Sequence, residues 1–207
     1  IHSEDYIQWV LEDNFAATMP DLARAGVEIV ADVDPYEEAK IRILNGGHTG
    51  LAYFGALAGH ATFDEAMRDA KLRGHFDRLE AQEVLPGLQP DLPFDRTSYC
   101  HRVAERFANE AIADALERIC MDGFAKFPIF IRPTIEGCLA QGITPRHCYE
   151  SIASWYIYAR RSAHQQTGIP YHEPNWHLLA PMLEPGCEAD FAASSLLWGC
   201  LLYTSPR

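Results

Sequence analysis

The stretch from Asp34 to Gly59 limits most strongly what this chain can fold into. Asp34 can cap a helix, Pro35 suits the first helical position, and Glu37 can close a capping box with Asp34. Small residues then recur, interleaved with leucines and aromatic residues that need burial. They are Gly47, Gly50, Ala52, Gly55, Ala56, Ala58 and Gly59. The pattern predicts a long central helix that neighbouring helices approach closely, and favours it over a loosely formed loop.

Three side chains in this stretch are candidates for catalysis: Lys40, Asn45 and His48. Lysine acts as a base when its pKa is lowered, asparagine can donate to an oxyanion, and histidine can orient a hydroxyl. At about 100° per residue, Asn45 lies roughly 140° and His48 roughly 80° from Lys40, so one broad half of the helix carries all three. Gly46 and Gly47 each cost about 1 kcal/mol in a helix relative to alanine, which favours a close approach to the backbone.

The rest of the chain predicts a mainly α protein with little or no sheet. The best strand candidate is Val27–Val33, which is β-branched and alternating. A capping box at Thr62–Glu65 predicts another helix, which runs toward Leu79 or Val84 with a possible break at Gly74. Further helices are expected over 97–120 (one or two), 134–141 and 145–166. Prolines predict an extended segment over 125–133 and a loop over 85–94.

Composition excludes several classes of protein. The 207 residues carry a net charge of -12 and no basic cluster, so we expect no nucleic-acid partner. No apolar run approaches the roughly 20 residues of a membrane span, and the first residues do not resemble a signal peptide. The six cysteines are scattered without a Cys-x-x-Cys pair, which favours free thiols in a reducing cytoplasm over a zinc site or a disulfide framework.

The Lys-x4-Asn-x2-His pattern of residues 40–48 resembles the signature of the polyol-specific long-chain dehydrogenases, the mannitol dehydrogenase family. Five further motifs resemble the same family in the same order: Tyr36-Glu37, and residues 48–53, 106–109, 114–118 and 122–128. The resemblance covers about residues 5–195, and several separated motifs in order make it highly specific.

The resemblance implies the C-terminal domain of a two-domain dehydrogenase, with a multi-helical fold similar to the C-terminal domain of 6-phosphogluconate dehydrogenase. No Gly-x-Gly-x-x-Gly follows a strand, so the N-terminal Rossmann domain, which would bind most of the cofactor, is expected to lie outside this chain. On this interpretation residues 1–33 are an arm or connector and 34–195 the helical catalytic and substrate domain. Residues 196–207 are an atypical tail, for which an artefact is one explanation.

The resemblance also assigns roles. Lys40 would be the general base that takes the alcohol proton as hydride goes to NAD(H) or NADP(H), Asn45 would help hold the alkoxide, and His48 would orient substrate. Taken alone, a helix lysine is more often solvated and a histidine more often structural. The family uses no metal, and the other histidines show no metal-ligand spacing such as His-x3-His on one helix.

Two further residues each have two possible roles. Glu37 is either a proton relay, as the resemblance suggests, or only the partner in the capping box. Arg118 lies in a motif whose arginine binds substrate in the family, and its alternative is a helix-end salt bridge. Arg106 and Asn109 are expected to be structural, and Lys126 fits either role.

The first functional hypothesis is an NAD(H)-dependent polyol dehydrogenase that interconverts a sugar alcohol of the mannitol or arabinitol type and its ketose. A fructuronate or tagaturonate reductase of the same family is the alternative within the class. A non-catalytic helical binding or assembly module is the alternative from another class. The chain by itself is expected to be inactive, because no dinucleotide site is recognised in it.

Overall fold

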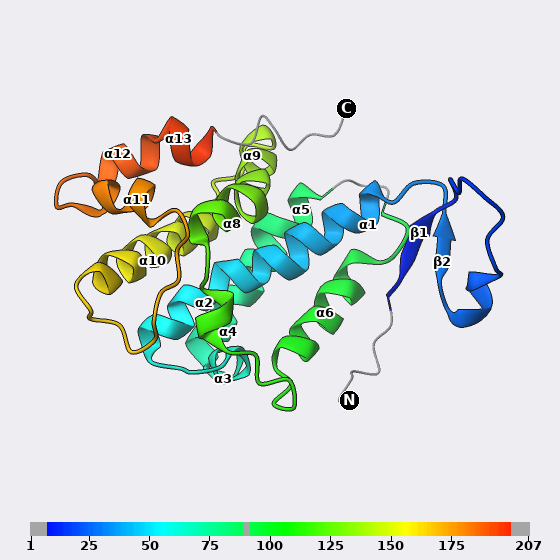
Figure 1. Cartoon of the computed structure of the whole chain (residues 1–207), viewed down its shortest axis with the longest axis horizontal. Helices are drawn as coiled ribbons and strands as arrows, with labels where there is room; N and C mark the ends of the chain where they lie inside the picture. The colour runs from blue at the N-terminus through cyan, green and yellow to red at the C-terminus, as the bar shows by residue number, and fades with distance from the viewer. Residues whose placement is uncertain (1–7, 89–91, 200–207) are drawn as a thin grey trace.

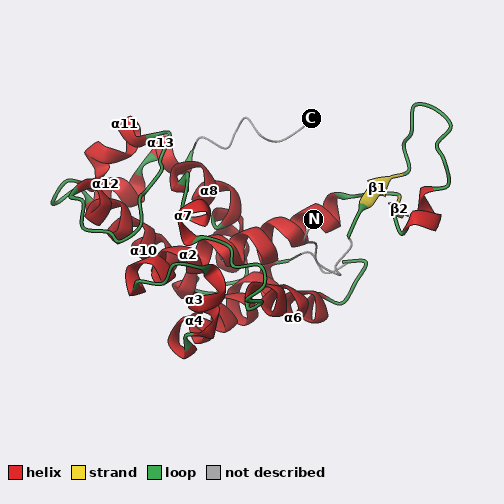
Figure 2. Ribbon diagram, turned by 60° about the horizontal axis from the view of Figure 1, so that its bottom comes forward, coloured by secondary structure: helices red, strands yellow, loops and turns green. Residues whose placement is uncertain are grey.

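The computed structural model describes residues 8–88 and 92–199 and is mainly helical, as expected. Two short strands, β1 (Val10–Glu12) and β2 (Glu28–Val30), pair in parallel, with a 3₁₀ helix, η1 (Leu22–Ala25), in their connection. Figure 2 shows this small sheet standing off one end of the helical body. The strand predicted over 27–33 is therefore real but shorter.

A central rod runs through the body (Figure 1). It consists of α1 (Asp34–Ala39), a π-helical segment η2 (Lys40–Asn45) and α2 (Gly46–Ala58), and it ends at Gly59 with a φ of 91°. The capping prediction is wrong, because Asp34 is itself the first helical residue and its N–H donates to Asp32 Oδ1 (2.9 Å). The helix dipole still favours the acidic residues of this first turn.

Small residues let the neighbouring helices approach α2. A Cβ on Gly50 would lie 2.5 Å from Leu79 Cδ2, and one on Gly55 would lie 2.8 Å from Ala66 Cβ. Leu51 and Tyr53 between them are fully buried. The predicted central helix is thus observed, with the close contacts that its composition indicates.

The next helices are α3 (Phe63–Arg68), α4 (Ala70–Leu79), the π-helical η3 (Glu80–Val84) and α5 (Leu85–Gly87). The capping box between Thr62 and Glu65 forms as predicted. The break falls at Asp69 instead of Gly74, because the Asp69 carboxylate accepts from the N–H groups of Lys71 and Leu72 and starts a new helix. The loop expected over 85–94 begins with α5, and residues 89–91 lie outside the described part.

The second half contains α6 (Arg96–Phe107), α7 (Leu116–Ile119), α8 (Gly123–Phe130), α9 (Arg132–Ala140) and α10 (Arg146–Ala163). The extended segment predicted over 125–133 is wrong, since it is helical. Pro128 lies near the end of α8, and Pro133 lies in the first turn of α9, where a missing N–H costs little. Burial of Phe127 and Ile131 favours the helical form.

The C-terminal helices are α11 (Trp176–Leu179), η4 (Ala180–Leu183), α12 (Glu188–Ala193) and α13 (Ser195–Trp198). Of these, η4 packs on α10 and α13 packs on α8, while α11 and α12 contact η4. Of the predicted atypical tail, residues 196–199 are described. Leu197 is buried, and Arg132 donates to the Trp198 carbonyl. Residues 200–207 lie outside the described part, so that portion of the prediction has no structural counterpart.

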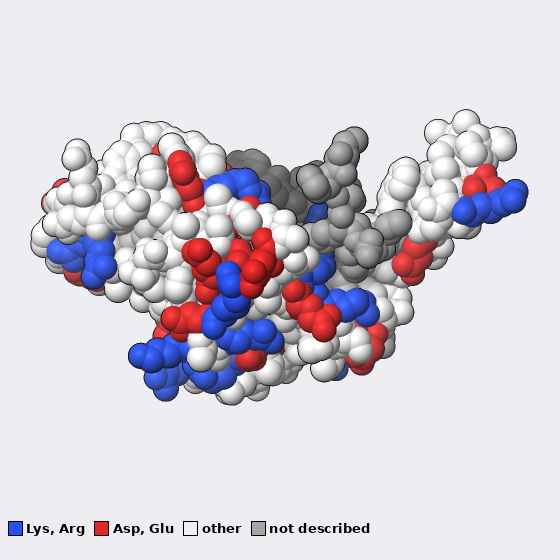
Figure 3. All heavy atoms as spheres, turned by 90° about the horizontal axis from the view of Figure 1, so that it is seen from below, with Lys and Arg blue, Asp and Glu red and all other residues white. Residues whose placement is uncertain are grey.

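The surface carries many ion pairs within single helices, such as Arg73–Asp77 (2.8 Å). On the face shown in Figure 3, basic and acidic side chains intermingle and do not separate into patches. None of the helices described is at once long and apolar enough to cross a membrane.

Candidate functional site

The candidate residues Lys40 and Asn45 are the first and last residues of the π-helical segment η2. In such a segment each N–H bonds to the carbonyl five residues earlier, as Gly46 N–H does to Ile41 O. Residues five apart then lie close to one turn apart, so the 140° separation expected for an α-helix is wrong here. The π-helix brings Lys40 and Asn45 toward one face, and such segments frequently occur at functional sites.

Lys40 and Glu37 are exposed side chains that line a cavity of about 720 Å³. Residues of β1 and Tyr99 of α6 line the same cavity. The small sheet is tied to the rod because Tyr36 donates a short hydrogen bond to Glu28 of β2. Burial, together with this carboxylate, raises the pKa of Tyr36 to about 12, so the phenol keeps its proton.

His48 packs against two aromatic rings that also contact each other. It stacks on Phe107 with ring centroids 4.1 Å apart and meets the edge of Phe63 at 4.4 Å. Burial lowers the pKa of His48 to about 4, with Arg118, Lys126 and Arg106 adding to the effect and Asp114 opposing it. The imidazole is therefore neutral near pH ~7 and can either donate or accept a hydrogen bond to a hydroxyl.

His48 lines a smaller cavity, of about 110 Å³. Leu44 and Arg106 line both this cavity and the one beside Lys40. The structure thus brings Lys40 and His48 to two adjoining hollows with Arg106 at their junction. The sequence predicted only a structural role for Arg106. The one local signal of a role in the site is its neighbour in the chain, Phe107, which stacks on His48. Asn45 is half-buried and lines neither cavity.

Arg118 is exposed and reaches the site through Asp114. Its Nε donates to Asp114 Oδ1 at 2.8 Å, its Nη2 donates a shorter bond to Oδ2, and Asp114 lines the His48 cavity. The salt bridge expected as the alternative role is present. It holds Arg118 next to Asp114, which lines the cavity, and a guanidinium there could also bind vicinal hydroxyls.

Lys126 is a second cation close enough to influence His48. Its ammonium is half-buried and donates to the Ile119 carbonyl at 2.9 Å, and burial lowers the pKa of Lys126. Asp114 precedes α7, Arg118 lies in α7 and Lys126 lies in α8. Residues 114–126 therefore place one carboxylate and two cations close enough to His48 to influence its pKa.

The start of α8, and with it Lys126, is held by a buried network that sequence reasoning missed. Glu173 Oε2 accepts from Phe124 N–H (3.0 Å) and from the Tyr171 hydroxyl (2.8 Å). Tyr171 in turn accepts from Trp155 Nε1 (2.7 Å). No short-range pattern signals this network, because its members come from α8, α10 and the segment before α11.

A comparison with families of known domains finds one match. Residues 32–184 match the family model of the mannitol dehydrogenase C-terminal domain. A D-arabinitol 4-dehydrogenase of Ralstonia nicotianae is 47% identical over 145 residues, which are 70% of this chain and 31% of that protein. A mannitol 2-dehydrogenase of Cereibacter sphaeroides is 35% identical over 200 residues, 96% of this chain and 42% of that protein.

Solved structures give the same result. The Pseudomonas fluorescens mannitol 2-dehydrogenase, in a ternary complex with NAD and D-mannitol, superimposes with a TM-score of 0.83 at 32% identity. The match covers 94% of this chain and 40% of that one. The chain spans less than half the length of each of these relatives.

Proposed function

Because the chain belongs to the mannitol dehydrogenase C-terminal domain family, we propose that it is the catalytic and substrate domain of an NAD(H)-dependent polyol dehydrogenase. Its substrate would be a sugar alcohol of the mannitol or arabinitol type, and its product the ketose. The observation that carries the proposal is the pair of adjoining cavities that hold Lys40 and His48 and meet at Arg106. The names of the arabinitol and mannitol relatives support the substrate class.

In the proposed reaction, Lys40 takes the proton of the substrate hydroxyl. Asn45, one turn along the π-helix, donates to the developing alkoxide, and neutral His48 orients the hydroxyl through a hydrogen bond. Glu37 lines the Lys40 cavity and is exposed, so it is placed to pass the proton to solvent. Arg118 and Lys126, which both influence His48, would hold the outer hydroxyls of the substrate.

The cofactor would supply the hydride acceptor, and a Rossmann domain of the same protein would bind most of it. The exposed positions of Lys40 and Glu37 fit this arrangement, since a second domain can reach that face. The partial coverage of the relatives supports such a domain. Closure by that domain would exclude water from Lys40 and from the reacting hydroxyl. A cytoplasmic location agrees with free thiols at the five cysteines that the structure describes.

Turnover measurements on the protein joined to its dinucleotide-binding domain test the base assignment. Lys40→Ala should lower kcat for polyol oxidation by at least about 100-fold near pH ~7. Lys71→Ala, on the outer surface of α4, is the matched control and should keep full activity. Near wild-type turnover by Lys40→Ala would refute the role of the lysine.

A hexuronate reductase is the second candidate, and one observation favours it. Three cations lower the pKa of His48, and one carboxylate, Asp114, raises it. The cations are Arg106, Arg118 and Lys126. This group of cations could bind a substrate carboxylate. A panel of polyols and hexuronates separates the two. Turnover of a hexuronate without turnover of any polyol would overturn the polyol assignment, and no turnover of either would favour a non-catalytic binding module.

A further inference from the structure

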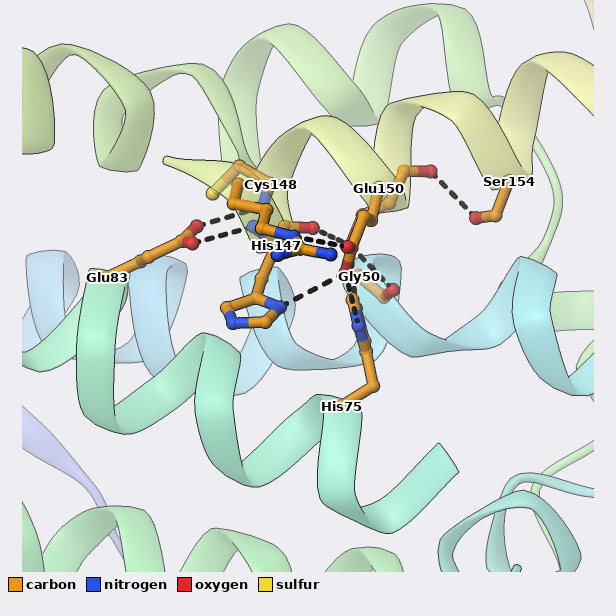
Figure 4. Close-up of polar contacts among 9 residues, drawn as sticks. Gly50, His75, Glu83, His147, Cys148, Glu150 and Ser154 are labelled. Carbon is orange, nitrogen blue, oxygen red and sulfur yellow. Dashed lines mark hydrogen bonds and ion pairs between the residues drawn. The ribbon is translucent and has the colours of Figure 1, made fainter. Parts of the chain in front are cut away.

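A buried cluster on the side of α2 that faces α4 and α10 has no role in the proposed reaction. His75 comes from α4, whereas His147 and Glu150 lie one turn apart at the start of α10 (Figure 4). Both imidazoles are more than nine-tenths buried. One ligand atom of each of the three residues lies within 4.8 Å of the other two. The cluster joins segments far apart in the sequence, so no local spacing could reveal it.

Ser151 lies against the ring of His75. Its Oγ is 3.2 Å from His75 Nε2 and 2.9 Å from two backbone carbonyls, Gly50 O and His147 O. When the single hydroxyl proton of Ser151 goes to one of these carbonyls, Ser151 Oγ accepts from His75 Nε2–H, and the lone pair of the ring lies on Nδ1.

That lone pair points at a carboxylate. His75 Nδ1 lies 3.4 Å from Glu150 Oε2, and His147 Nδ1 lies 3.1 Å from the same oxygen. In that tautomer His75 Nδ1 and Glu150 Oε2 are both acceptors, so a cation between them can bind both.

The distances suit a metal ion. Two ligands held about 2.0–2.1 Å from a tetrahedral ion lie about 3.3 Å apart, close to both observed nitrogen–oxygen separations. Two imidazoles and one carboxylate are ligands that select zinc-type ions over calcium or magnesium. We propose that His75, His147 and Glu150 form a structural site for a zinc-type divalent cation that clamps α4 to α10 beside α2.

The surroundings supply what such a site needs beyond three ligands. Ser151 orients His75, and Arg146 Nε holds the other carboxylate oxygen of Glu150 at 2.9 Å, which leaves Oε2 for the ion. A cavity of about 630 Å³ opens beside His147 and Glu150 and gives access for the ion and for a water as fourth ligand. Glu83 and Glu150 balance Arg78 and Arg146 in its wall.

Calorimetric titration of the chelator-stripped protein with zinc chloride, backed by metal analysis, tests the proposal. We expect one ion per chain with a Kd of about 1 μM or lower, and a Tm that rises by about 5–10 °C at zinc concentrations near 100 times Kd. His75→Ala and His147→Ala should each weaken binding by more than about 100-fold. Ser151→Ala, which removes only the orienting group, should weaken it by about 10–100-fold.

Two variants keep the test independent of folding defects. Glu150→Gln preserves the size of the side chain, so its metal-free Tm should stay near that of the wild type while zinc binding is lost. His101→Ala removes a histidine from an exposed pair with Glu105 (3.3 Å) that has no second histidine beside it, and should bind zinc normally. No saturable binding by the wild type, or binding that Glu150→Gln and His75→Ala leave unchanged, would overturn the proposal. This outcome is independent of dehydrogenase activity.

Discussion

The imidazole of His48 stacks on the phenyl ring of Phe107, with centroids 4.1 Å apart and ring planes 12° apart. Phe63 meets the imidazole edge-on at 4.4 Å and also contacts Phe107 at 4.9 Å, so the three rings pack together and shield His48 from water. The pKa of His48 is thereby lowered from 6.5 to about 4. In the unfolded chain it returns to its ordinary value, so the unfolded state binds a proton that the native state does not.

This pKa difference predicts how stability depends on pH. His48 contributes its full stabilisation above pH ~6.5, and the contribution is lost as the pH falls toward about 4, by up to about 1.4 kcal/mol per pH unit. Urea unfolding across this window measures the slope, with a chelator present throughout. His48→Gln should flatten the slope, whereas exposed His101→Gln should not. Equal slopes in wild type and His48→Gln would contradict the assignment.

At Gly47, near the start of α2, the packing leaves no room for a side chain. A Cβ at this position would lie 2.8 Å from both Glu80 Oε1 and Phe76 Cε2, and both partners are buried. Gly47→Ala should therefore lower the free energy of unfolding by about 1–3 kcal/mol. Gly168→Ala is the control, because no atom lies within 4 Å of its Cβ, and it should be neutral or slightly stabilising. Similar unfolding midpoints for the two variants would disprove the close packing.

Substitution of Arg118 should weaken substrate binding with little change in the free energy of unfolding. Its side chain is 67% exposed in the pair with Asp114, so Arg118→Ala should change the free energy of unfolding by less than about 1 kcal/mol. If Arg118 holds substrate as proposed, KM should rise about tenfold in the protein joined to its dinucleotide-binding domain, with a smaller change in kcat. The control is Arg73→Ala, from the exposed pair with Asp77, which should leave KM unchanged. An unaltered KM in Arg118→Ala would reduce the pair to a surface salt bridge.

Removal of the buried carboxylate of Glu83 should lower the free energy of unfolding strongly. Its oxygens accept from the N–H groups of His147 (2.6 Å) and Cys148 (2.8 Å) at the start of α10. Glu83→Ala leaves two buried donors without partners and should cost about 2–5 kcal/mol in urea unfolding. Glu83→Gln keeps one acceptor oxygen and should cost less. Glu110→Ala, on a side chain 70% exposed, is the control, and a loss in Glu83→Ala no greater than in this variant would contradict the capping role.

Local signals predicted several boundaries correctly. The capping box at Thr62, the stop at Gly59 and the long helix observed as α10 all depend on residues within a few positions of one another. The extended segment expected over 125–133 was wrong, because proline tolerance depends on where a helix happens to begin and end. The π-helical segment was not predicted, since its bonding pattern differs from an α-helix by one residue and is selected by packing.

By itself, the amino-acid sequence determined the mainly helical class, the central rod with its small residues, the family, and the order of Lys40, Asn45 and His48 along one helix. Only the tertiary structure decided that Phe63 and Phe107 pack against His48, that Arg106 lies where the two cavities meet, and that His75 faces His147 and Glu150. The physical reason is the distance along the chain over which each interaction acts. Helix propensity and capping act over one or two turns, whereas burial, pKa shifts and convergent ligand atoms arise when segments distant in the chain pack together.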